Sequence, residues 1–188
     1  MPPTADAKFT AHPPTVWLSY QWAHDWYDDA LRAARETGRG PRRHEIVFSI
    51  AFAESYIFEF VLVQALVDVA DQFREINEYF PPGEYRNVQD KWKVVPKDLH
   101  AKGRIAASPD LDGQDWEDFL TLVDYRNGLV HGRSSRPDTS ELSEDLKPMP
   151  TTQFLDDLEP GWALQIVTRQ VRALHAAANL ELPAWLIS

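Results

Sequence analysis

The sequence predicts an all-α protein, a helical bundle of about four main helices with short additional ones. Apolar residues recur at the three- and four-residue spacing of helices, and we find no convincing hairpin. Glycine and proline cluster at 38–41, 81–83 and 159–161, which separates the periodic stretches from one another. With 188 residues, 44% of them hydrophobic, the chain has enough apolar material for one domain with one core.

The first predicted helix covers residues 16–37. It follows a proline-rich segment, residues 1–14, which we expect to be an extended arm, so that residues 15–188 form the single domain. Tryptophan, tyrosine and leucine residues form two apolar stripes along this helix, so the helix should pack on more than one side. Gly38 and Gly40-Pro41 are expected to end it.

The second helix is predicted over residues 43–80, which contain no glycine or proline. Its middle, residues 46–70, is apolar nearly all round and long enough to span a bilayer. Each acid inside a membrane would cost roughly 2.5–3.5 kcal/mol. Four polar residues interrupt the stretch: Glu54, Glu59, Gln64 and Asp68. We therefore expect a buried central helix, or a helix shared with a second subunit, and not a membrane-spanning one.

The remaining pattern predicts three further helices. A short one over residues 88–95 should stop before Pro96, because proline lacks the helical N–H donor. The next should run from Gly113 to about His131, with its core stripe formed by Trp116, Phe119, Val123 and Val130.

A polar segment, residues 133–158, follows and is expected to be a long loop. The last helix should begin near Pro160 and run to about Asn179, with an apolar stripe toward the core. His175 lies among alanines in this helix and is expected to be partly exposed. The apolar tail, residues 182–187, should dock on the core.

Charge and composition exclude several functions. The formal net charge of −10 argues against broad, sequence-independent coating of nucleic acid, although a small basic cleft remains compatible with it. The chain has no cysteine, which excludes disulfides, zinc–thiolate sites and cysteine nucleophiles. The absence of cysteine is consistent with the cytoplasmic location that we expect, and the first residues show no signal-peptide pattern.

The sharpest functional signal is a basic stretch in this acidic chain. Residues 125–137 contain three arginines, one histidine and no carboxylate. Asn127 and His131 are four residues apart and share a helical face, whereas Arg126 and His131 are separated by about 140° around the axis. Arg126 follows the apolar stripe, so it needs a partner. We expect Glu54 or Glu59 to face it, within the subunit or across an interface.

This trio fits metal-free RNA cleavage. The helix dipole favours a protonated His131, and a cationic imidazole beside a guanidinium suits a phosphate. The 2′-hydroxyl of the substrate would attack the adjacent phosphorus. His131 would act as general base or acid, and Arg126 would stabilise the charge of the transition state, with no metal or cofactor.

The segment Arg126-Asn127-Gly128-Leu129-Val130-His131 resembles the signature of the HEPN superfamily: an arginine, a polar residue, three further residues and a histidine near the end of a late helix. A preceding long helix with acids, here residues 53–60, belongs to the same resemblance. It implies an α-helical bundle that dimerises and brings two motifs into one cleft. Many members are metal-independent endoribonucleases of toxin–antitoxin, phage-defence or RNA-processing systems, whereas others are inactive scaffolds or nucleotide-binding partners.

Carried onto this chain, the resemblance places Arg126 and His131 in the catalytic positions and Asn127 in the polar position. Arg133 stands two residues after the histidine, where one toxin subgroup has a tyrosine. This departure makes that subgroup, with its nucleotidyltransferase antitoxin, a less suitable assignment. By position, Arg133 and Arg136 would guide the RNA backbone, and Glu54, with Glu59 as second choice, would orient Arg126.

Three alternatives stay open. Arg126 and His131 could simply belong to a helix C-terminus capped by Gly132. The protein could be a catalytically silent HEPN-like module that binds a protein partner or a nucleotide, or a helical protein unrelated to that superfamily.

His24 and Asp28 have the spacing of two metal ligands, but two ligands make no site, and a solvated helix face is the better interpretation.

Overall fold

The computed structural model describes residues 22–61, 79–80, 86–131 and 154–187. These residues form helices and no strand, which confirms the all-α prediction. No helix among them is long and apolar enough to cross a membrane. The predicted arm, residues 1–14, lies outside the described part. The helices are α3 (Trp22–Ala34), α4 (Arg39–Phe60), α6 (Val88–Ala101), α7 (Gln114–His131), α8 (Phe154–Asp157), α9 (Trp162–Ala178) and α10 (Ala184–Ile187).

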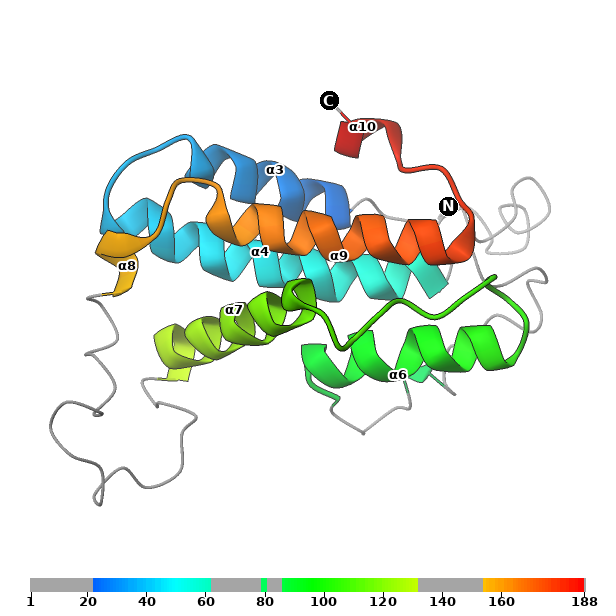
Figure 1. Cartoon of the computed structure of the whole chain (residues 1–188). Helices are drawn as coiled ribbons and strands as arrows, with labels where there is room; N and C mark the ends of the chain where they lie inside the picture. The colour runs from blue at the N-terminus through cyan, green and yellow to red at the C-terminus, as the bar shows by residue number, and fades with distance from the viewer. Residues whose placement is uncertain (1–21, 62–78, 81–85, 132–153, 188) are drawn as a thin grey trace, which may run out of the picture.

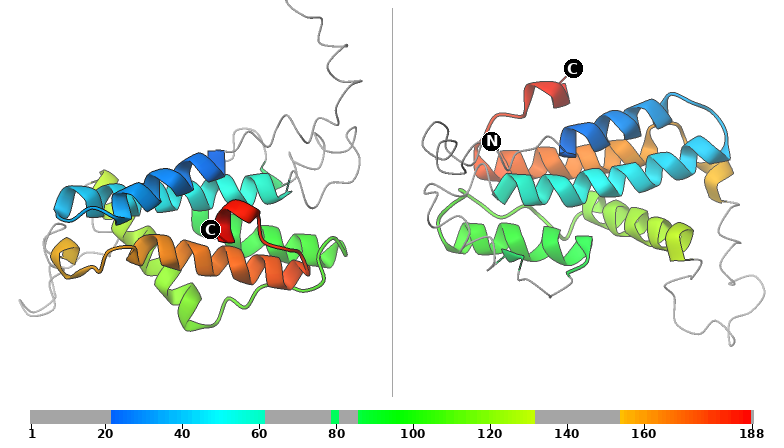
Figure 2. Two further views of the ribbon diagram at one scale, coloured as in Figure 1. Left: turned by 90° about the horizontal axis from the view of Figure 1, so that it is seen from above. Right: turned by 180° about the vertical axis from the view of Figure 1, so that it is seen from behind.

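Helix α4 is the centre of the bundle and contacts α3, α6, α7, α8 and α9. It forms an antiparallel pair with α3, and α9 runs alongside both of them (Figure 1). Helices α6 and α7 lie below this layer in Figure 1, and the views of Figure 2 show the same arrangement from above and behind. The prediction of a buried central helix is therefore confirmed for the described part of that stretch, and residues 62–78 lie outside it.

The start of α4 differs from the prediction. We expected Gly40-Pro41 to separate two helices, but α4 already begins at Arg39 and includes both residues in its first turn. Proline is tolerated there because the first N–H groups of a helix have no partner within the helix. The chain reverses one residue earlier, at Gly38, whose φ of 105° favours glycine.

The predicted stop before Pro96 is also wrong, because α6 continues through it to Ala101. A proline inside a helix costs about 3 kcal/mol. Two features of α6 offset that cost: the Oδ1 atom of Asn87 caps the helix by accepting from the backbone N–H of Asp90 at 2.8 Å, and its apolar face is buried. Pro96 is itself buried, so its ring adds to the core.

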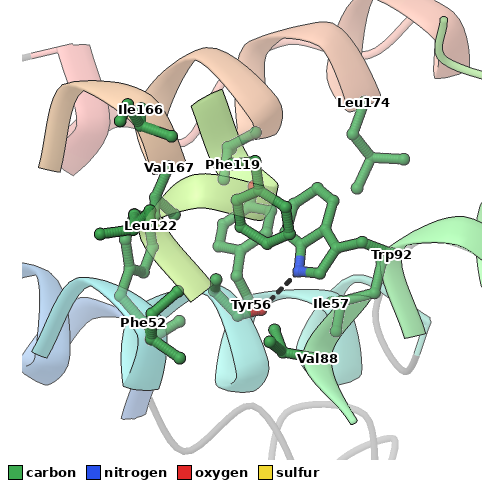
Figure 3. Close-up of a cluster of buried hydrophobic side chains, with 14 of the residues drawn as sticks. Phe52, Tyr56, Ile57, Val88, Trp92, Phe119, Leu122, Ile166, Val167 and Leu174 are labelled. Carbon is green, nitrogen blue, oxygen red and sulfur yellow. Dashed lines mark hydrogen bonds between the residues drawn. The ribbon is translucent and has the colours of Figure 1, made fainter. Parts of the chain in front are cut away.

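Side chains of α4, α6, α7 and α9 meet in the core, part of which Figure 3 shows. The indole Nε1 of Trp92 donates to the backbone oxygen of Ala53 at 3.0 Å and so joins α6 to α4. On α7 the expected core positions Trp116, Phe119 and Val123 are buried. Val130 is 50% exposed, which corrects the predicted stripe near the end of that helix. The core residues labelled in Figure 3 are Phe52, Tyr56, Ile57, Val88, Trp92, Phe119, Leu122, Ile166, Val167 and Leu174.

The C-terminal tail docks on the bundle as predicted. Trp185 packs against the aromatic rings of Tyr27, Phe52 and Tyr56. Contrary to expectation, His175 is only 2% exposed, because the ring turns inward between α4 and the tail. Its Nδ1 lies 2.7 Å from the backbone oxygen of Glu181, and its Nε2 contacts the Tyr56 hydroxyl.

These contacts make His175 a source of acid sensitivity. A carbonyl oxygen only accepts, so Nδ1 carries the proton and Nε2 accepts from Tyr56 in a neutral ring. Burial lowers the pKa of His175 below its usual value of about 6.5. The unfolded chain then binds the proton more readily, so the stabilisation is complete above about pH 6.5 and decreases as pH falls below it.

We therefore expect the free energy of unfolding, measured with urea, to fall between about pH 7 and pH 5. The His175→Ala variant should be less stable than the wild type at neutral pH, and its free energy of unfolding should decrease less between about pH 7 and pH 5. His100→Ala, which removes an exposed histidine, is the control and should keep the wild-type fall. An equal fall in both variants would assign the acid sensitivity to other groups.

Candidate active site at the end of helix α7

The predicted motif forms the C-terminal end of α7. Arg126 and Asn127 are both half-buried, and the Nη1 atom of Arg126 donates to the Oδ1 atom of Asn127 at 3.0 Å. His131 is the last residue of the helix. Its side chain lies outside the described part, as do Arg133 and Arg136. The described residues therefore bring together two of the three predicted catalytic side chains.

The bond between Arg126 and Asn127 determines what the guanidinium offers. A guanidinium has five N–H donors, and Asn127 accepts from one nitrogen through a neutral amide oxygen. The positive charge is therefore not compensated by this partner. A planar, charged fork with further donors is suited to a phosphate group, which it can bind through two parallel hydrogen bonds.

The two predicted supporting acids have other partners. The Oε1 atom of Glu54 accepts from the Nζ atom of Lys91 on α6 at 3.1 Å. The Oε1 atom of Glu59 accepts from the backbone N–H of Ala23 at 3.0 Å, and burial raises the pKa of Glu59. Within the described part of one chain, neither acid is paired with Arg126. Contact across a subunit interface stays a prediction.

An aromatic stack that the sequence analysis did not single out borders the motif. Tyr125, the residue before Arg126, stacks on Phe154 of α8 with ring centroids 4.1 Å apart and an interplanar angle of 26°. Trp162, at the start of α9, lies 5.7 Å from the Tyr125 ring. Two residues after Phe154, Asp156 accepts from the Nε atom of Arg39 at 2.6 Å. Helix α8 thus links the end of α7 to the start of α4.

A buried ion pair supports the same end of the bundle. Glu45 is 1% exposed, and its Oε2 atom accepts from the Nη1 atom of Arg42 at 3.1 Å. The same carboxylate caps α9, because it accepts from the backbone N–H groups of Gly161 at 3.2 Å and Ala163 at 2.9 Å. The signal in the sequence was an arginine and a glutamate three residues apart in an apolar helix, a spacing that places them on one face.

Metal-based chemistry has no identifiable centre in the described ranges. They hold no group of three histidine or acidic side chains close enough to bind an ion. The proposed pair of His24 and Asp28 is 3.7 Å apart, and the His24 ring stacks on Trp185 instead of joining further ligands.

No protein-family model, curated protein or solved structure matches the chain. Any assignment of function therefore depends on the residues and their geometry.

Proposed function

We propose that the protein is a metal-independent endoribonuclease of the HEPN type, with Arg126, Asn127 and His131 as its catalytic residues. The observation that supports this most is the neutral partner of Arg126. Had Arg126 been a structural ion-pair residue, a carboxylate would be its expected partner in the bundle. Instead its described partner is the neutral amide of Asn127, so no described carboxylate compensates the charge of the guanidinium.

The proposed reaction is internal transesterification of RNA. The 2′-oxygen loses its proton and forms a bond to the adjacent phosphorus, and the bond from phosphorus to the 5′-oxygen breaks. A proton is delivered to that leaving oxygen, so the products are a 2′,3′-cyclic phosphate and a 5′-hydroxyl. Arg126 stabilises the negative charge on the phosphoryl oxygens, and His131 transfers one of the two protons.

A homodimer would supply the second proton-transfer group. One histidine per motif is sufficient for either the base or the acid, whereas two motifs in one cleft provide both. Val130, within the motif, is an apolar side chain that is half-exposed, and a contact between subunits would cover it. The resemblance to HEPN proteins also implies a toxin or phage-defence role, with an antitoxin or effector protein as the partner.

Cleavage in the presence of EDTA tests this proposal. The wild-type protein should cut members of a panel of structured and single-stranded RNAs, and EDTA should leave the rate unchanged. Circular dichroism on the same sample should show a folded helical protein. A folded protein that cuts no RNA in the panel would contradict the proposal and favour the silent module that binds a protein or a nucleotide.

A further inference from the structure

A second basic stretch lies at the turn between α3 and α4. Residues 32–44 contain five arginines, one histidine and one acid, Glu36, in a chain with 19 basic and 29 acidic residues. This local excess of positive charge is larger than that of the predicted motif region. The sequence analysis did not identify it, because the stretch spans the boundary between two helices.

Three of the five arginines have described partners. Arg32 pairs with Asp29 at 3.2 Å, Arg42 is buried against Glu45, and Arg39 pairs with Asp156. Arg35 and Arg43 are exposed, and no ion pair to another described residue is seen for either. Two guanidinium groups at this turn are therefore available to solvent and to a ligand.

The two exposed arginines lie on either side of the turn, because Arg35 follows the last residue of α3 and Arg43 is in the second turn of α4. The first turn of α4 contains no acid, although the positive end of the helix dipole favours acids there. A surface with this local excess of positive charge, in an acidic protein, suits an interaction with an anionic partner.

The turn lies at the same end of the bundle as the motif. Helix α8 connects the two, because Asp156 holds Arg39 at the start of α4 while Phe154 stacks on Tyr125 beside Arg126. Figures 1 and 2 show the α3–α4 turn, α8 and the C-terminal end of α7 at one end of the molecule. A polyanion that contacts both Arg126 and the α3–α4 turn would run along this end of the bundle.

We infer that the α3–α4 turn, through Arg35 and Arg43, binds the phosphate backbone of the RNA outside the cleavage site. This inference rests on the proposed function for its ligand and extends it to a second contact surface. Binding there would be independent of base sequence, because guanidinium groups contact phosphates, which carry no sequence information. It would also allow an acidic protein to hold RNA with only a few cationic contacts.

The test is the salt dependence of RNA binding by the full chain. Fluorescence anisotropy with a labelled, short single-stranded RNA would be measured in the His131→Ala background, so that cleavage does not interfere. Each lost phosphate contact lowers the slope of log affinity against log salt by about 0.7 for a single strand. Arg35→Ala with Arg43→Ala should therefore lower the slope by about 1.4 and weaken binding.

The matched control is Lys93→Ala with Lys97→Ala, which removes two exposed cations from α6. Equal slopes for the two double variants would overturn the inference, and so would the absence of RNA binding. Cleavage by the wild type with equal slopes would reject this surface and leave the ribonuclease standing. Binding that depends on Arg35 and Arg43, without cleavage by the wild type, would support the surface and reject the ribonuclease.

Discussion

Replacing Glu45 with alanine should destabilise the protein by about 3–5 kcal/mol, the effect expected when one member of a buried ion pair is removed. The variant would leave the buried guanidinium of Arg42 without its carboxylate. It would also remove the acceptor for the backbone N–H groups of Gly161 and Ala163 at the start of α9. Because Glu45 is on α4, the loss would weaken the attachment of α9 to the central helix.

Urea unfolding followed by circular dichroism would measure the difference. Glu54→Ala is the matched control, since it removes a glutamate from the same helix whose partner, Lys91, is only partly buried. That change should cost no more than about 1 kcal/mol. Similar losses in the two variants would show that the contact between Glu45 and α9 is not a main source of stability.

Replacing His131 with alanine should lower the rate of RNA cleavage by about 10²–10⁴-fold, the usual contribution of a general acid or base. The free energy of unfolding should change little, because the residue is the last one of α7. His100→Ala provides a control, since it removes an exposed histidine from α6. Cleavage at the wild-type rate by the His131 variant would exclude this histidine from the reaction.

The parts of the fold that the sequence predicted well are those with unambiguous periodicity and end signals. Helix α7 was expected from Gly113 to about His131 and runs from Gln114 to His131. Helix α9 was expected to end near Asn179, and Asn179 is its C-cap in the left-handed conformation. In each case an apolar stripe of helical spacing is bounded by residues whose backbone preferences oppose continuation.

Tertiary contacts explain the corrections. Pro96 would end a helix in isolation, but burial of its surroundings keeps α6 intact. His175 is buried by a tail that lies six to ten residues further along the chain. The helical spacing of apolar residues within α9 gives no information about where that tail packs. The partners of Glu54 and Glu59 were equally inaccessible, because an apolar helix buried nearly all round gives no indication of which neighbour each face meets.

The site was predictable in residue type and only partly in geometry. The expected trio includes Arg126 and Asn127, which are in contact, whereas a carboxylate was the expected partner of Arg126. The stack of Tyr125 and Phe154 joins residues on two helices that are far apart in the chain. Such a contact depends on how α8 packs, and the short α8 has too few residues for a periodic pattern.

The most direct measurement of the central claim uses a DNA strand that contains a single ribonucleotide. If the 2′-hydroxyl of the substrate is the nucleophile, the protein should cut only at the 3′ side of that ribonucleotide, in EDTA, and leave a 2′,3′-cyclic phosphate. The matching strand with a 2′-O-methyl group at that position should stay intact. Cleavage of the methylated strand, or a product with a 5′-phosphate, would show attack by water and contradict the proposed roles of Arg126 and His131.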